Sequence, residues 1–386
     1  MLLTIVIFVL VLSVLVAAHE LGHFFTARLF GVRAEEFGFG FPPRAVGWYK
    51  NRFGRWRKVV GNRDMDSLLS SADQNLHPAS RATIWSLNWL PIGGFVKIKG
   101  EDGGDKDQSD SFGAKKIWQR VIILAAGVAM NIILAWLLFS GGYLIGLPQS
   151  TDQLGPRAIV SDAAVVIAQV MPDSVAQRAG LQDGDIILSV NGQPVGTEQS
   201  LQDAIAANAG EPATLLIKRG GGEETATVVP QSVNGARATI GIAIFASGSV
   251  RYPFFDAIRE GLKTTGWVLD QIVRSLFNLL SEVFKGQSVS GDFAGPVGIA
   301  TITGQAARLG FTYLLQFMAL LSLNLAVINI IPFPALDGGR IIFLLIEKAK
   351  GRPVRKEVET LIHNIGFLLL IALVVFVTFK DIIKLF

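Results

Sequence analysis

Four long apolar stretches constrain the fold of this chain more than any other feature of its sequence. They cover residues 2–18, 121–147, 313–331 and 361–379, and the first stays largely apolar beyond His19. A helix needs about 20 mostly apolar residues to cross the hydrocarbon core of a bilayer. Half of the 386 residues are hydrophobic and 17% are charged, which excludes an ordinary soluble protein, a disordered chain and a fibrous repeat. We therefore expect an α-helical polytopic membrane protein with about four transmembrane helices and one inserted soluble domain.

The first stretch has the length of a signal peptide as well as that of a membrane span. A signal peptide carries its positive charge in front of the apolar run. Here the first positive residue is Arg28, which lies behind it. We therefore expect a retained transmembrane helix.

Basic residues between the apolar stretches predict the orientation of the chain, because cytoplasmic loops carry an excess of Lys and Arg. Residues 28–120 hold 16 Lys and Arg against 10 Asp and Glu, and residues 340–359 hold 6 against 3. Residues 147–260 hold 7 against 12. These counts place the first two segments in the cytoplasm and the third outside. The net charge of +4 is too small to indicate nucleic-acid binding.

Residues 155–245 differ from the rest, because charged and polar residues return between short β-type runs. Turn signals such as Asp183-Gly184-Asp185 separate these runs. The segment 173–192 closely resembles a PDZ domain of the bacterial protease type, and 239–242 resembles the loop that closes the peptide groove of a circularly permuted PDZ domain. PDZ domains bind extended peptides by adding them to a sheet edge. The alternative is a small β module that only spaces or shields the membrane part.

The remaining segments are expected to lie beside the membrane. Residues 28–116 form a cytoplasmic or membrane-associated β-hairpin region and loop, and 341–360 form a second cytoplasmic loop. Within 250–310, charges interrupt apolar residues at helical spacing, which favours interfacial amphipathic helices over a fifth span. The Gly-rich connector 286–310 is expected to be an ordered loop. The four transmembrane helices are then placed at 1–27, 117–147, 311–340 and 361–386.

Two of the four histidines lie one helical turn apart, in the run His19-Glu20-Leu21-Gly22-His23. Positions i and i+4 share one face of a helix, so both imidazoles can bind one metal ion. Glu20 lies beside them and can accept a proton from a water molecule that the metal activates. Polar groups are costly among apolar membrane residues and are usually functional there. The alternative is a pair of helix-end histidines that hydrogen-bond to their neighbours.

A catalytic zinc ion needs a third protein ligand and an open position for water. The chain has no cysteine, which excludes a thiolate ligand. Asp337 is the favoured candidate, because it follows the third apolar stretch in a segment where two prolines break the helix and two glycines permit tight turns. A helix-capping role is the alternative for this carboxylate. His77 lies in a polar stretch, and His363 could approach the site only if the fourth span packed there.

The order of these features resembles the site-2 protease family of intramembrane zinc metalloproteases, in particular its bacterial regulator-of-sigma-E protease type. The resemblance rests on the HExxH motif in the first span, the Asp337-Gly338 pair after the third and a single PDZ-like segment between them. It implies that His19, His23 and Asp337 bind Zn²⁺ and that Glu20 is the catalytic base. It also implies a multi-pass protein of the bacterial inner (cytoplasmic) membrane with an extracytoplasmic PDZ domain.

The resemblance extends to residues around this site. Gly127 and Asn131 match a GxxxN element of the second span, where a small residue lets helices approach. Asn324 and Asn329 match asparagines that contact the substrate backbone, although amides within spans also serve as structural hydrogen-bond partners. The structural positions expected near the site are Gly127, Asn131, Pro332, Pro334 and Gly338.

Two further segments match the family. Residues 37–43 resemble its membrane-associated hairpin, and 91–98 resemble the strand that follows, so Gly94 and Phe95 are expected to contact substrate. An edge strand there could hold an unwound substrate by strand addition. The polar and basic insertion 51–81 matches nothing.

The resemblance implies a zinc metalloendopeptidase that cleaves peptide bonds within transmembrane segments of single-span membrane proteins, such as anti-sigma factors or remnant signal peptides. The alternative is a non-catalytic membrane receptor or scaffold whose PDZ domain binds peptides. A third hypothesis is a transporter, but a transporter would be expected to contain inverted repeats, which the sequence does not show.

Overall fold

The computed structural model describes residues 2–51, 54–61, 83–101, 103–150, 154–220, 222–232, 238–286 and 294–383. The chain divides into two compact units, one made of residues 1–139 and 262–386 and the other of residues 140–261. His77 and most of the insertion 51–81 lie outside the described residues.

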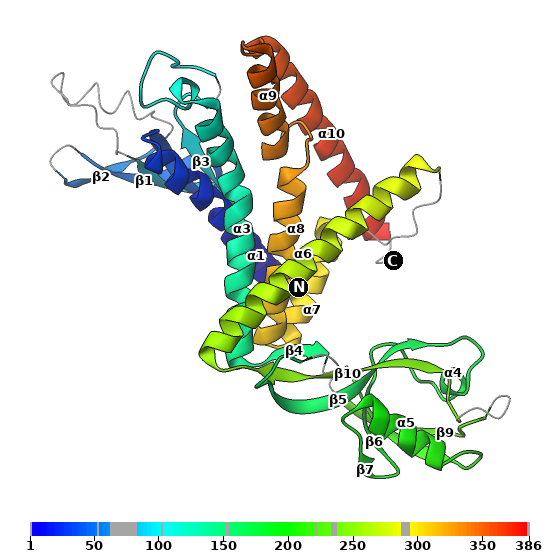
Figure 1. The fold of residues 1–386 in the computed structure, drawn as a ribbon. Helices are drawn as coiled ribbons and strands as arrows, with labels where there is room; N and C mark the ends of the chain where they lie inside the picture. Colours follow the sequence, from blue (N-terminus) through cyan, green and yellow to red (C-terminus); the bar gives the residue numbers. More distant parts are fainter. Residues whose placement is uncertain are drawn as a thin grey trace. The chain divides into compact units, whose positions relative to one another are not determined.

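Four described helices are long and apolar enough to cross a membrane, and they are the four that the sequence predicts (Figure 1). They are α1 (Leu2–Leu29), α3 (Ile117–Ile145), α8 (Phe311–Ile330) and α10 (Lys356–Ile383). Only 6% of the apolar window of α10 is buried, which suits a helix that faces lipid.

The helices α1, α3 and α8 share an apolar core. Val11 and Leu15 of α1 are buried with Met318 of α8, and Leu134 of α3 packs against them. This packing holds α1 beside α3 and α8.

A three-stranded antiparallel sheet packs against α1. Its strands are β1 (Ala34–Lys50), β2 (Trp56–Val59) and β3 (Ile84–Ile98), in the order β2-β1-β3. Residues 36–39 of β1 pair with 84–87 of β3 on one side and with 94–97 of β3 on the other. The second half of β3 is therefore an edge of this sheet. This agrees with the strand expected over 91–98.

The structure corrects the expected loop over 286–310. Residues Pro296–Leu309 form helix α7, which begins with a proline in its first turn. The glycines that suggested a loop allow close packing instead, since a Cβ on Gly304 would lie 2.4 Å from the Thr4 side chain of α1. Asp381 of α10 completes the start of α7 by accepting hydrogen bonds from the N–H groups of Gly295 and Gly298, at 3.1 and 2.8 Å.

Two other expectations need correction. The third span ends at Ile330 rather than at 340, and the chain breaks before a separate helix, α9 (Asp337–Lys350). The segment 341–360, expected to be a loop, is therefore largely helical, because α9 runs to Lys350 and α10 begins at Lys356. The sequence did not predict α9, because this helix is too short to span a bilayer and carries Gly338 and Gly339 directly after its first residue, Asp337. The expected amphipathic helices form one helix of 31 residues, α6 (Phe254–Phe284).

The second unit is β-rich. Its seven-stranded sheet has the order β4-β10-β5-β6-β8-β9, with β7 paired to β6. Two helices, α4 (Val175–Arg178) and α5 (Glu198–Ala207), accompany the sheet, and its core includes Leu201 of α5 and Ile187 of β6. The strands are β4 (Leu147–Ser150), β5 (Ile159–Val170), β6 (Ile186–Val190), β7 (Gln193–Pro194), β8 (Ala213–Arg219), β9 (Gly222–Val228) and β10 (Ile242–Arg251).

A buried ion pair makes this unit sensitive to acid. The Asp185 carboxylate accepts hydrogen bonds from Nε and Nη2 of Arg219, at 2.7 and 2.6 Å, and from the Gln182 N–H at 2.9 Å. Burial alone would raise the pKa of Asp185, but these bonds outweigh it and lower that pKa below its usual range. The ionised carboxylate therefore stabilises the folded unit above the unfolded pKa of about 3.9, and this stabilisation is lost as the pH falls below that value.

We expect Asp185→Asn to remove this dependence. Intrinsic amide exchange slows as the pH falls toward 3, so the readout is the protection factor of amides within residues 140–261 of the intact protein. Protection factors should fall in the wild type between about pH 5 and about pH 3. In the variant they should be lower already at neutral pH and change less over the same range. Glu223→Gln, at an exposed position of β9, is the matched control. An unchanged acid response in Asp185→Asn would contradict the assignment.

Candidate metal centre

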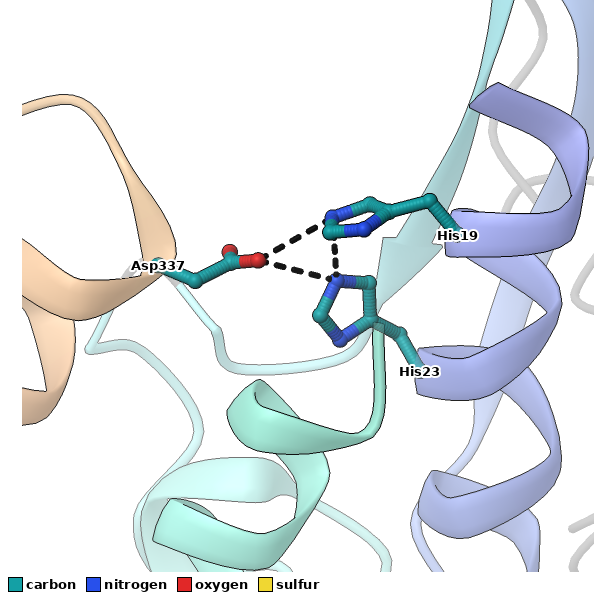
Figure 2. A group of neighbouring side chains, drawn as sticks. All are labelled: His19, His23 and Asp337. Atoms are coloured by element: carbon teal, nitrogen blue, oxygen red, sulfur yellow. Dashed lines mark hydrogen bonds and ion pairs between the residues drawn. The ribbon is translucent and has the colours of Figure 1, made fainter. Parts of the chain in front are cut away.

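His19, His23 and Asp337 converge on one point, although 314 residues separate His23 from Asp337 in the sequence. Figure 2 shows both imidazoles projecting from α1 toward the carboxylate at the start of α9. The Nε2 atoms of the two histidines are 3.1 Å apart. Oδ2 of Asp337 lies 3.0 Å from Nε2 of His19 and 3.4 Å from Nε2 of His23.

These three separations fit a tetrahedral metal ion. Ligand atoms about 2.0–2.1 Å from a tetrahedral zinc ion lie about 3.3 Å from one another. Two nitrogens and one carboxylate oxygen leave a fourth position open, as a catalytic zinc site requires. Burial alone would raise the pKa of Asp337, but hydrogen bonds to both histidines outweigh it and hold that pKa below its usual range. The carboxyl is therefore ionised at neutral pH, which is the form that binds a cation.

Neighbouring groups orient both imidazoles. Nδ1 of His23 lies 2.8 Å from the Ile123 carbonyl oxygen of α3, so Nδ1–H donates to it and the Nε2 lone pair points into the site. Nδ1 of His19 lies 3.4 Å from Nδ2 of the Asn131 amide, so this side chain of α3 contacts the ring on the side away from Nε2. The Ser322 hydroxyl of α8 donates to the Asn131 backbone carbonyl at 2.8 Å, which connects α8 to α3 beside the two histidines.

Two glycines let α1 and α3 approach closely enough to form the site. A Cβ on Gly22 would lie 2.2 Å from the Ala126 carbonyl oxygen. A Cβ on Gly127 would lie 2.4 Å from Nε2 of His23 and 2.6 Å from Cε1 of His19. The space that the two imidazoles occupy exists because residue 127 has no side chain.

The break between α8 and α9 positions Asp337. A Cβ on Gly338 would lie 2.3 Å from the carbonyl oxygens of Ile330 and Ile331, so the tight return of the chain requires glycine there. His363 of α10 accepts a hydrogen bond from the Ala335 N–H at 2.8 Å. Its ring therefore supports the segment before Asp337 and does not belong to the group of three ligand atoms.

Glu20 occupies the next position on α1 after His19. Its Oε2 atom accepts a hydrogen bond from the Val96 N–H of β3 at 3.1 Å. The second half of β3 thus lies beside the turn of α1 that carries His19 and His23. On the far side of the break, Arg340 of α9 forms an ion pair with Glu101, which links α9 to the segment that follows β3.

Peptidase family M50 matches residues 7–58 and 76–373 of this chain, and the match spans the HExxH motif, the PDZ-like segment and Asp337. The chain belongs to peptidase family M50. This M50 chain is an enzyme, a zinc metalloprotease of the site-2 protease family.

Several bacterial zinc metalloproteases are similar to this chain over nearly its whole length. The regulator of sigma-W protease RasP of Bacillus subtilis is 29% identical and covers 99% of each chain. Zinc metalloprotease RasP of Geobacillus kaustophilus is 28% identical and covers 99% of this chain and 98% of its own. A Clostridium perfringens chain, provisionally named as a zinc metalloprotease, is 34% identical over 97% of each. The PDZ domain of an SdrC-like protein of Listeria monocytogenes covers 22% of this chain at 24% identity, with a TM-score of 0.21.

The other site residues expected from the sequence lie on α3, on β3, on α8 and in the break before α9. Gly127 lies where a side chain would collide with both histidines, and Asn131 contacts His19. Gly94 and Phe95 lie on the edge half of β3, next to Val96. Asn324 is exposed on α8, and its side chain donates to the Leu320 carbonyl oxygen of the same helix. Asn329 lies in the last turn of α8, while Pro332 and Pro334 lie in the break before α9.

Sequence reasoning missed several groups that build this M50 site. The Ile123 carbonyl and the Val96 N–H are backbone groups, and a residue type gives no signal for them. Gly22 had a detectable signal, because a glycine in an otherwise aliphatic helix indicates close packing. Ser322 had a weaker one, as a hydroxyl among apolar residues of a span.

Proposed function

We propose that this chain is an intramembrane endopeptidase that hydrolyses peptide bonds within the transmembrane segments of single-span proteins. The convergence of two imidazoles and one carboxylate from α1 and α9 carries this proposal, because α1 is itself long and apolar enough to cross a membrane and α9 follows α8, which is another such helix. Anti-sigma factors and remnant signal peptides are the substrate classes that we propose.

His19, His23 and Asp337 are the proposed ligands of a zinc ion. A bound zinc ion supplies Lewis-acid chemistry, which polarises the scissile carbonyl and acidifies water. The bond from Nδ1–H of His23 to the Ile123 carbonyl fixes that ring with its Nε2 lone pair inward, and the Asn131 amide contacts Nδ1 of the His19 ring. Asp337 contributes a negative charge that offsets part of the charge of the cation.

Glu20 is the proposed general base. Its carboxylate accepts the proton that the attacking water loses as the new C–O bond forms. It then passes that proton to the amide nitrogen as the C–N bond breaks, which yields a carboxylate and an amine. A glutamate adjacent to His19 on the same helical turn can serve both transfers with small movements of its side chain.

A substrate helix must unwind before it can be cut, because its peptide groups are hydrogen-bonded within the helix. We propose that the unwound segment adds to the edge half of β3, where Gly94 and Phe95 lie. Asn324 and Asn329 are the proposed side-chain contacts to the substrate backbone. Asn324 would first give up its bond to the Leu320 carbonyl.

The β-rich unit is proposed to be a PDZ domain that binds an extended peptide. A groove of about 360 Å³ lies between α5 and β10, and it is lined by apolar side chains that include Leu201, Ile205 and Ile242. Gly241, which precedes β10 and has φ of +78°, also lines this groove. Binding there would sense or sieve the outer part of a substrate.

The charge counts between spans support an orientation with both termini outside, in the bacterial inner membrane. The segments 28–120 and 340–359 are then cytoplasmic, and the β-rich unit is extracytoplasmic. This orientation puts the metal-binding turn near the cytoplasmic side of the bilayer. Cleavage would then release a fragment into the cytoplasm.

Gly127→Ala should disrupt the metal site although the change adds only one methyl group. The new Cβ would lie 2.4 Å from Nε2 of His23, so an imidazole must move. A displacement of about 1 Å at a reacting centre costs about 100-fold in rate, and we expect a loss of that size with reduced zinc content. Gly141→Ala on the same helix is the control, because nothing lies within 4 Å of its Cβ position. Equal zinc content and activity in the two variants would contradict the packing argument.

The function is tested directly with purified protein and a full-length single-span substrate in detergent. Cleavage should stop when a zinc chelator is added and should return when zinc is restored in excess. Cleavage that continues without metal would contradict the proposed zinc chemistry, as would restoration by magnesium alone.

A further inference from the structure

The proposed general base is not free in this structure. Oε2 of Glu20 accepts a hydrogen bond from the Val96 N–H at 3.1 Å, although 76 residues separate the two. Both residues are partly buried. A carboxylate held by a backbone donor has lost one of the oxygen lone pairs with which it could accept a proton from water.

The strand register shows which side of β3 this N–H faces. Val96 is opposite Phe37 of β1, and Phe95 is opposite Gly38. Successive residues of a strand direct their N–H and C=O groups to opposite sides. Because the Val96 N–H reaches Glu20, the peptide groups of Gly94 and Val96 face away from β1, and those of Phe95 and Lys97 face toward it.

The outward side of this half-strand is a place for strand addition. Among the described residues, β1 is the strand that pairs with 94–97, and no second strand lies on the outer side. The side chains of Leu21 and Phe24 on α1 pack with Phe37 and Val96, which keeps the edge close to the metal-binding turn. A substrate strand that paired here would present a carbonyl oxygen to the Val96 N–H.

One N–H group cannot make two full-strength hydrogen bonds, so Glu20 and a substrate carbonyl compete for it. We propose that the Val96 N–H holds Glu20 in a resting position and that pairing of an extended substrate with β3 releases the carboxylate. The inference rests on the function proposed above, and it makes Val96 a positioning residue through its backbone. A substrate segment that is still helical cannot pair with the edge, and it leaves the base held.

Two substitutions of Glu20 separate the competing acceptor from the base. Glu20→Gln retains an oxygen that can accept from the Val96 N–H, whereas Glu20→Ala removes it, and neither variant can act as a base. We expect the alanine variant to bind an uncleaved single-span substrate about 3- to 10-fold more tightly than the glutamine variant, because no side chain competes for the N–H. Affinity is measured by titration of fluorescently labelled substrate into zinc-loaded protein in lipid nanodiscs.

Residue-resolved amide exchange provides a readout that a general loss of structure would not reproduce. Without substrate, the Val96 amide should exchange faster in Glu20→Ala than in Glu20→Gln. The Phe95 and Lys97 amides, which face β1, should exchange equally in both variants. Addition of substrate should then protect the Val96 amide in both.

The outcomes separate this inference from the function on which it rests. A wild type that cleaves single-span substrates, together with equal substrate affinity and equal Val96 exchange in the two variants, would overturn the inference alone. Faster exchange at Phe95 and Lys97 as well would overturn it too, because it would show that the strand and not one contact has changed. A zinc-loaded wild type that cleaves no single-span substrate would overturn the proposed function and this inference together.

Discussion

Glu20→Gln should lower kcat for a single-span substrate by about 10²- to 10⁴-fold, which is the usual contribution of a positioned general base. Zinc content should stay unchanged, because the three converging ligand atoms belong to His19, His23 and Asp337. The amide cannot accept the proton that the attacking water loses, yet it has nearly the shape of the carboxylate. A loss of activity without a loss of metal therefore isolates the proton transfer.

Steady-state cleavage and metal content measured on the same purified sample would test this expectation. Glu223→Gln makes the same chemical change at an exposed position in β9 and should leave kcat unchanged. Full activity in Glu20→Gln would remove Glu20 from the mechanism. A parallel loss of zinc would indicate that Glu20 supports the metal site rather than the chemistry.

Asp337→Ala should have the second large effect, a loss of zinc and of activity together. Removing the carboxylate leaves two nitrogen ligands, and we expect zinc affinity to fall by more than about 100-fold, beyond the effect of losing a supporting group outside the ligand set. Asp337 also lies in the first turn of α9, where an acidic side chain stabilises a helix by up to about 1 kcal/mol. Loss of a metal ligand would lower the zinc content, whereas loss of a helix-stabilising charge would lower only the thermal stability.

A matched substitution separates these roles. Asp256 lies in the first turn of α6, so Asp256→Ala makes the same change at another helix start. It should alter thermal stability while leaving zinc stoichiometry intact. If Asp337→Ala retained stoichiometric zinc and behaved like Asp256→Ala, the carboxylate would be a helix-stabilising group and the third ligand would have to be sought elsewhere.

Sequence patterns predicted the parts of this protein that depend on local spacing. The four spans follow from uninterrupted apolar runs, and the pairing of His19 with His23 follows from the helical repeat. Asp337 is different, because it lies 314 residues after His23. Helix-breaking prolines and the resemblance to a known family identified it as a ligand candidate, and the residue spacing alone did not place it near α1.

Tertiary packing decided what the sequence could not predict. The glycines of α7 and α9 lower helix propensity in water, but here they permit close helix contacts, so segments expected to be loops are helical. The contact of Glu20 with β3 depends on a backbone N–H, and every residue except proline carries one. No residue type could have indicated that Val96 supplies it.

The position of the cut bond tests the central claim most directly. A single-span substrate and the purified wild type are reconstituted in the same lipid bilayer, and the masses of both products are measured with and without a zinc chelator. We predict two complementary fragments whose junction lies within the apolar span, and neither should form in the presence of the chelator. A junction confined to the substrate's soluble flanks, or cleavage that the chelator does not prevent, would contradict an intramembrane zinc endopeptidase.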